Sequence, residues 1–148
     1  MLRIKNCRNN ERGSTLVEFS IGVTVFITAM FAVMEFGRAL WVHNALTDAA
    51  RRGARYATLH TQADSASVKN VVVYGNPEGS GEPLLNNLST GIVDVDYNNF
   101  GLNDGTVSVS IDQYQFQFVI PIFGASITMP NYKTTLTAES AGLLPANV

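Results

Sequence analysis

The chain has 148 residues, about one domain by length, and 46% of them are hydrophobic, which is enough for an ordinary core. Its charged content is 15% and its formal net charge is −2, so the sequence offers no basic field to hold nucleic-acid phosphates. One cysteine and two histidines exclude a disulfide framework and a metal centre rich in cysteine or histidine.

Charge is distributed unevenly along the chain. Residues 1–13 contain four basic side chains and one acid. Residues 60–148 contain eight acids and two basic side chains, Lys69 and Lys133. Such a split indicates that the two ends of the chain occupy different environments.

An uncharged apolar run, residues 19–34, lies between Glu18 and Glu35. Extending it back to Ser14 gives a segment long enough, as a helix, for a bilayer core of about 30 Å. The run is apolar on every side, which argues against the core helix of a soluble protein, and no A-x-A pattern of a cleaved secretory signal follows it. We therefore predict a transmembrane helix over 14–35. Four arginines beyond it balance the four basic residues of the leader, but Arg51–Arg55 lie 17–21 residues past Met34, at the edge of the range that sets orientation, which slightly favours a cytoplasmic N-terminus.

Glu18 stands inside this predicted span. A carboxylate in hydrocarbon costs on the order of 2–3 kcal/mol at depth, so such a residue usually has a partner. One interpretation places Glu18 at the headgroup level instead. In the other, a cut after Gly13 exposes the α-amine of Ser14, and this ammonium pairs with Glu18 of a neighbour in an assembly of parallel helices. Away from water the pair would fix the axial register between subunits.

The stretch R-G-S-T-L-V-E-F, Arg12–Phe19, resembles the prepilin-peptidase site of type IV pilin-like proteins: a basic leader, a glycine at the cut and a glutamate five residues later. Two further stretches, Met34–Trp41 (M-E-F-G-R-A-L-W) and Ala49–Ala57 (A-A-R-R-G-A-R-Y-A), resemble the TadE-like family. Members of this family are minor pseudopilins of tight-adherence (Flp pilus) secretion systems. The resemblance covers about the first sixty residues, and more loosely the tail Thr134–Ala141.

The resemblance implies that Gly13 and Ser14 flank a scissile bond and that Glu18 is the acid at the fifth mature position. It implies a bacterial inner-membrane protein with a periplasmic head, whose partners are the prepilin peptidase, other pilin or pseudopilin subunits and inner membrane lipid. Ser14 departs from the Phe or Met that opens many major pilins, which leaves N-methylation open. Cys7 lies in the leader, so the mature product would have no cysteine.

Beyond Glu35 the helical pattern continues to about Leu59. Apolar and small residues recur there at three- and four-residue spacing, with charged residues on the other side. Glu35 and Arg38 are three residues apart on one face, which predicts an ion pair at the outer membrane edge, with an assembly contact as the alternative. The predicted organisation is a leader over 1–13, a transmembrane helix over 14–35, an amphipathic helix over 36–59 and a β-rich head over 60–148.

The rest of the chain alternates β-forming runs with turn signals, such as the Gly75–Pro83 loop. The alternation changes phase at Asp112–Gln113, which predicts a bulge or bend. The expected fold class is α+β, with the long helix packed on a small antiparallel sheet. Strands are predicted at Val68–Tyr74, Ile92–Tyr97, Thr106–Ile120 (ended by Pro121) and Tyr132–Ser140.

No catalytic constellation is found. The run Asp94–Asn99 begins like a calcium loop, but the sixth position is Asn99 where a glycine is expected, and a strand with outward acids fits better. Only His43 and His60 are available to a serine triad, and both are interpreted as structural. We expect no enzyme activity, catalytic residue, cofactor, metal, nucleic acid or small-molecule substrate.

Two functions follow from the sequence. The first is a minor pilin or pseudopilin that is cleaved after Gly13 and joins or initiates a pilus-like filament. The alternative is a permanently anchored single-span membrane protein whose acidic periplasmic head binds a partner, with Glu18 incidental. A membrane-tethered hydrolase would require a polar cluster that the sequence does not supply.

Overall fold

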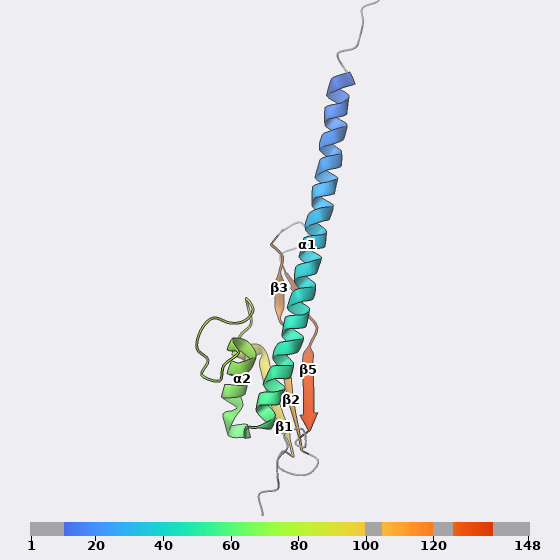
Figure 1. Cartoon of the computed structure of the whole chain (residues 1–148). Helices are drawn as coiled ribbons and strands as arrows, with labels where there is room; N and C mark the ends of the chain where they lie inside the picture. The colour runs from blue at the N-terminus through green and yellow to red at the C-terminus, as the bar shows by residue number, and fades with distance from the viewer. Residues whose placement is uncertain (1–10, 100–104, 120–125, 138–148) are drawn as a thin grey trace, which may run out of the picture. The chain divides into compact units, whose positions relative to one another are not determined.

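The computed structural model describes residues 11–99, 105–119 and 126–137, and the expected α+β fold class is confirmed (Figure 1). The chain divides into two compact units, Met1–Arg38 and Ala39–Val148. The second unit, Ala39–Val148, is called the head below. One helix, α1 (Glu11–Thr58), belongs to both units, since it begins in the first and ends in the head.

The first part of α1 is long and apolar enough to cross a membrane. Its large side chains are exposed on every side of the helix, including Val17, Phe19 and Phe26 at 61%, 68% and 64%. A helix that is apolar all round buries no stripe against its own chain and suits a lipid environment. The predicted helix over 14–35 and its continuation to about Leu59 are both confirmed as one α-helix.

Within the head, α1 becomes amphipathic. Its buried face consists of small and aliphatic residues spaced three and four apart, which is the pattern of a helix packed along one side. The opposite face is charged and exposed. The buried residues on this face are Val42, Leu46, Ala49, Ala50, Ala54 and Ala57.

The strand predicted at Val68–Tyr74 is wrong, because this segment is a helix, α2 (Ser65–Tyr74). Its valines favour strands by propensity, but Val68 and Val72 lie one helical turn apart and both are fully buried in the head core. The helix ends at Gly75, whose left-handed φ of 79° lets its N–H donate to the carbonyl of Val71 at 3.1 Å. Tertiary burial therefore overrides local propensity here.

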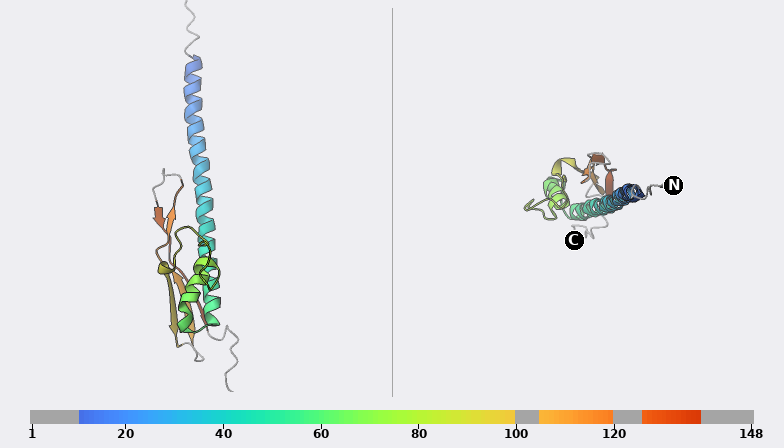
Figure 2. Two further views of the ribbon diagram at one scale, coloured as in Figure 1. Left: turned by 90° about the vertical axis from the view of Figure 1, so that its left-hand side faces the viewer. Right: turned by 90° about the horizontal axis from the view of Figure 1, so that it is seen from above.

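Three antiparallel strands form the main sheet in the order β1-β2-β5. These are β1 (Val93–Asn98), β2 (Thr106–Ile111) and β5 (Tyr132–Thr137). They confirm the strands predicted at Ile92–Tyr97, at the start of Thr106–Ile120 and at Tyr132–Ser140, although residues 120–125 and 138–148 lie outside the described residues. Both helices cover one face of this sheet (Figure 2).

A bend at the end of β2 carries the chain out of the main sheet. Gln113 has a positive φ of 57°, a conformation that turns the backbone sharply, and the phase change predicted at Asp112–Gln113 is confirmed. The chain then enters a second sheet made of β3 (Gln115–Gln117) and β4 (Ser126–Thr128). The strand β4 is not predictable from the sequence, because its three residues are too few to show alternation.

The two helices and the sheet approach one another closely at Gly53. A Cβ atom on Gly53 would collide with Cγ2 of Val72 in α2 and lie 3.4 Å from Cγ1 of Val109 in β2. Val72 and Val109 are both fully buried. Glycine is therefore required at this position by the close approach of three elements, although it is a poor helix former.

Substitution of Gly53 by alanine should destabilise the head. Alanine favours helix by about 1 kcal/mol, but overpacking a filled core typically costs about 1–3 kcal/mol, so the expected net loss is up to about 2 kcal/mol. All five tyrosines lie in the head, so thermal unfolding of the full chain in detergent, followed by near-UV circular dichroism, reports on it. The control is Gly37→Ala, where no atom lies within 4 Å of the new Cβ. Equal melting temperatures for both variants would contradict the packing argument.

A second contact joins the last described strand to α1. His43 Nδ1 and the hydroxyl oxygen of Tyr132 form a hydrogen bond of 2.9 Å, and the two rings meet edge to face with centroids 5.2 Å apart. Burial raises the pKa of the Tyr132 phenol, with a smaller contribution from Tyr114. The pKa of Tyr97 is also raised, first by burial and then by the nearby charge of Asp64.

These raised pKa values predict that the head loses stability in alkali. The folded state holds the phenol protons more tightly than the unfolded chain, so stability is fully present below pH of about 10 and falls as pH rises through the folded-state pKa values. Thermal unfolding of the full chain, measured from pH 8 upward, should show this decline. Tyr132→Phe should cost about 0.5–1.5 kcal/mol at pH 8 through the lost hydrogen bond, and should make the alkaline decline less steep. An unchanged decline would show that Tyr132 has no part in it.

Candidate processing and assembly site

Gly13 and Ser14 lie in the first turn of α1, and Glu18 lies one turn further on. Because residues four apart share a helix face, Ser14 and Glu18 project from the same side. Both are exposed, and no atom approaches within 4 Å of the position that a Gly13 Cβ would occupy. The three residues therefore form one accessible strip at the start of the helix, which we call the processing strip.

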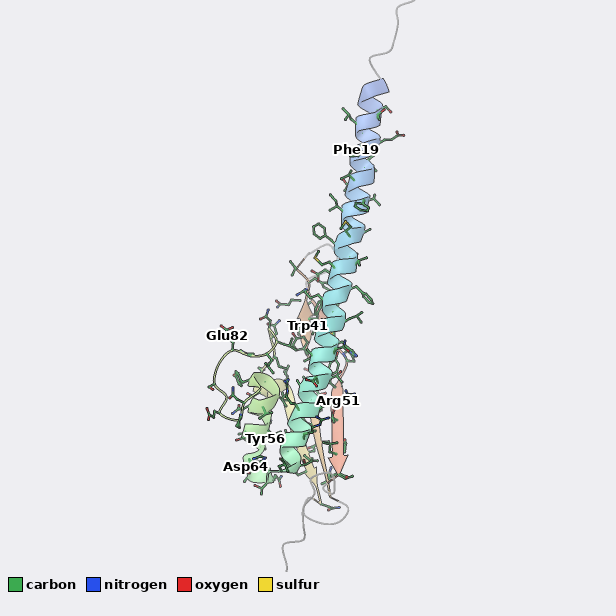
Figure 3. The ribbon with its side chains drawn as sticks, viewed as in Figure 1. Phe19, Trp41, Arg51, Tyr56, Asp64 and Glu82 are labelled. Atoms are coloured by element: carbon green, nitrogen blue, oxygen red, sulfur yellow. The ribbon has the colours of Figure 1, made fainter. Side chains whose placement is uncertain are left out.

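The processing strip is set in apolar surroundings. Leu16, Val17 and Phe19 lie within two residues of Glu18 and are each more than 60% exposed; Phe19 is labelled in Figure 3. Within the described part of the chain, Glu18 forms no ion pair. A carboxylate placed among such side chains would face lipid or another helix rather than bulk water, and it then requires a cation.

The hydroxyl groups further along the helix do not provide a partner for the Glu18 carboxylate. Ser20, Thr24 and Thr28 each donate a hydrogen bond of 2.8 Å to the carbonyl four residues earlier. Such internal bonds satisfy polar side chains within an apolar helix. Ser20 is two residues from Glu18, nearly opposite it around the helix, so this hydroxyl row and Glu18 occupy different faces.

At the other end of the apolar section, Glu35 and Arg38 form an ion pair. Arg38 donates to Oε2 of Glu35 from Nη2 at 2.8 Å and from Nε at 3.2 Å. Glu35 is 5% exposed, whereas the Arg38 side chain is 38% exposed. The buried carboxylate is thus neutralised by an arginine that reaches outward. The predicted position of this pair at the membrane edge stays a prediction.

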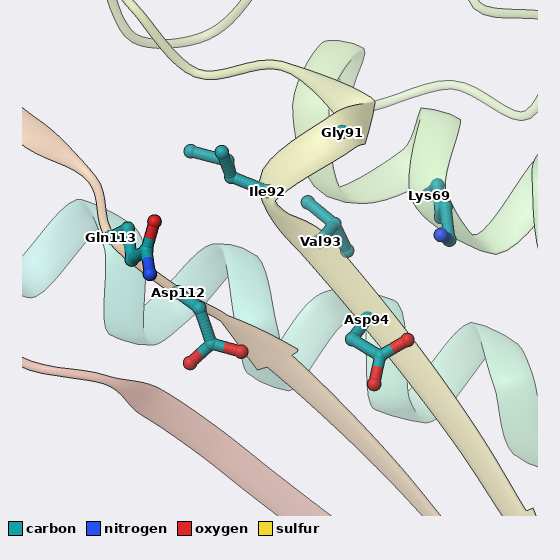
Figure 4. Close-up of a pocket in the computed structure, with 7 residues that line it drawn as sticks. All are labelled: Lys69, Gly91, Ile92, Val93, Asp94, Asp112 and Gln113. Atoms are coloured by element: carbon teal, nitrogen blue, oxygen red, sulfur yellow. The ribbon is translucent and has the colours of Figure 1, made fainter.

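An open pocket of about 380 Å³ lies beside the start of β1 (Figure 4). Lys69, Asp94 and Asp112 line it, and Asp112 accepts a hydrogen bond of 3.3 Å from the Ser110 hydroxyl. Residues 11–99, 105–119 and 126–137 contain no group of three His, Cys, Asp or Glu side chains that would hold a metal. The run Asp94–Asn99 falls largely on β1, where Asp94 and Asp96 are exposed, as expected of a strand with outward acids.

The comparison with protein-family models finds a match that includes the processing strip. The described features are a long N-terminal helix with an apolar section, the exposed Glu18 near the start of that section, and an α+β head. Residues 13–55 match the sequence model of the TadE-like protein family, which confirms the expected resemblance. The match covers less than a third of the chain, and over these residues the chain is similar to TadE-like proteins. No curated protein and no solved structure was found to match it.

The match covers only part of the structure. It begins at Gly13 and ends at Arg55, so it covers the processing strip, the Glu35–Arg38 pair and nearly all of α1. The strands and α2 lie outside it. TadE-like proteins are associated with pili, and the one apolar helix found in the described residues suggests membrane anchoring.

Proposed function

We propose that this protein is a minor pilin or pseudopilin that a prepilin peptidase cleaves between Gly13 and Ser14, and that it then takes part in assembling a tight-adherence pilus or secretion apparatus. In this proposal it has no turnover of its own. It is inserted in the bacterial inner membrane with its N-terminus cytoplasmic and its head periplasmic.

The observation that carries the proposal is the position of Glu18. It is the one charged residue between Gly13 and Glu35, and it lies one helical turn after Ser14 on the same face. A new amine at Ser14 would supply a cation at the correct depth for a carboxylate on a neighbouring, parallel helix. Pairing in a medium of low dielectric constant is strong when formed and costly when broken. Assembly by this pair would reject subunits that are out of register.

The cut after Gly13 requires a residue without a side chain beside the scissile carbonyl. Gly13→Ala adds a methyl group there, and we expect cleavage in a strain with its own peptidase to slow by about tenfold or more. The measurement is the ratio of precursor to mature chain on a gel after a pulse label. Gly22→Ala is the matched control, since its new Cβ also meets no atom within 4 Å. A permanently anchored protein would show one unprocessed species in every strain.

Glu18→Gln keeps the size of the side chain and removes its charge. The amide binds an ammonium far less strongly, so we expect membrane insertion to persist while recovery in the sheared pilus fraction falls about tenfold, a loss of about 1.4 kcal/mol. Glu78→Gln, on the exposed loop of the head, is the control with the same change in charge. Equal recovery of both variants would contradict a role for the Glu18 charge in assembly.

A further inference from the structure

The two layers of the head carry opposite charge on their outer faces. On the helix layer, Arg51, Arg52 and Arg55 are exposed, on the side of α1 opposite the buried Ala50 and Ala54. These three residues are called the arginine face; Arg51 is marked in Figure 3. Asp48 is the acid beside them, and its carboxylate is 3.9 Å from Nη1 of Arg52.

On the sheet layer, Asp94 and Asp96 of β1 are exposed, and these two are called the aspartate face. The residues that alternate with them, Val93, Val95 and Tyr97, point toward the helices. Lys133 of β5 lies in the same cross-strand row as Asp94, with Ser110 between them. The row Asp96–Ser108–Thr135 contains no cation.

The two charged faces lie at the same level along the head. Gly53 packs against Val109 of β2, and Val109 pairs in register with Val95 of β1. Val95 lies between Asp94 and Asp96 in the chain, while Gly53 lies between Arg52 and Arg55. A second copy can therefore be placed beside the first, displaced across the head but not along it. In that position the arginine face of one copy lies opposite the aspartate face of the other.

The charges on both faces are available for such a contact. Among the residues that the structure describes, Arg51 and Arg55 have no acid within 4.0 Å, and Asp94 and Asp96 have no cation within that distance. The head sequence beyond α1, residues 60–148, holds eight acids and two basic side chains, so the arginine face is the concentration of positive charge in the head. Complementary charged surfaces of this kind select partners and orient them as they meet.

We propose that the arginine face of one copy docks on the aspartate face of a second copy of this chain. The proposal rests on the proposed assembly function and adds the head surfaces through which neighbours recognise one another. The contact is heterologous, with a different face from each copy, because two arginine faces or two aspartate faces would repel. Heterologous contacts that do not close into a ring generate open arrays, which suits a filament or its initiating complex.

The contact can be tested in membranes with two tagged forms of the full chain, both carrying Cys7→Ser. One carries Leu59→Cys, next to the arginine face, and the other carries Asn98→Cys, next to the aspartate face; both positions are exposed. A short bis-maleimide should link the two forms to each other more than it links either form to itself. Equal linkage within and between the forms would overturn the heterologous contact, as would a lack of linkage between them.

Charge reversal then tests the chemistry of the contact. Arg51→Glu with Arg55→Glu, in the Leu59→Cys form, should reduce linkage to the Asn98→Cys form about fivefold, a coupling of about 1 kcal/mol. Asp94→Lys with Asp96→Lys in the opposing form should restore it. The control is Glu78→Lys with Glu82→Lys, at exposed loop positions, which changes the net charge by as much as the two aspartate-to-lysine substitutions. It should not reduce linkage between forms with intact charged faces, and it should not restore linkage to the form with reversed arginines.

Either of two results would overturn the proposal. One is linkage that is unchanged when Arg51 and Arg55 are replaced by glutamate, and the other is linkage that is restored by Glu78→Lys with Glu82→Lys. If the lysine variants misfold, Asp94→Asn with Asp96→Asn removes the charge at nearly constant shape and should still lower linkage. The N-terminus of each form is sequenced in the same samples. Linkage between heads without cleavage at Gly13 would support the docking contact and contradict the proposed processing, whereas cleavage without linkage would do the reverse.

Discussion

The cost of a carboxylate in an apolar environment is the constraint on which this account depends. Glu18 lies among side chains that are exposed on all sides of α1, and the hydroxyls of Ser20, Thr24 and Thr28 are already bonded within the helix. The chain thus places one charge near the start of a section that has no other before Glu35. No cation of the same copy pairs with Glu18 within the described residues, and in the proposed function the free amine of Ser14 on a neighbouring copy is its partner. In the proposed function, cleavage and assembly are linked by this one electrostatic requirement.

The helix that carries Glu18 is also a structural element of the head. Between Ala39 and Thr58 it buries alanines and Gly53 against α2 and β2, and the small size of these residues lets three elements approach closely. The hydrogen bond between His43 and Tyr132 adds a polar link from the same helix to β5. The close packing fixes the level of the arginine face relative to the aspartate face. The packing of the head and the proposed contact between heads therefore depend on the same residues of α1.

Much of this architecture could be predicted from the sequence because the signals are local. The length of α1, the strands β1 and β2 and the bend at Gln113 follow from apolar periodicity and its phase. The helix α2 could not be predicted in this way, because valine-rich sequence favours strands and only its burial against the head core decides the outcome. Glu18 is recognisable as a charge in an apolar run. The His43–Tyr132 bond joins residues 89 positions apart, and the shared level of the two charged faces depends on strand register, so neither leaves a signal in the sequence.

The most direct test of the central claim is a zero-length cross-link between Ser14 and Glu18. Membranes that contain isotope-labelled and unlabelled copies would be treated with an apolar carbodiimide, which joins an amine to a carboxylate only when the two are in contact. The account predicts a peptide in which the amine of Ser14 from one copy is bonded to Glu18 of the other, detected by mass spectrometry as a mixed-isotope product. Cross-links confined to single copies, or a chain that still begins before Ser14, would contradict it.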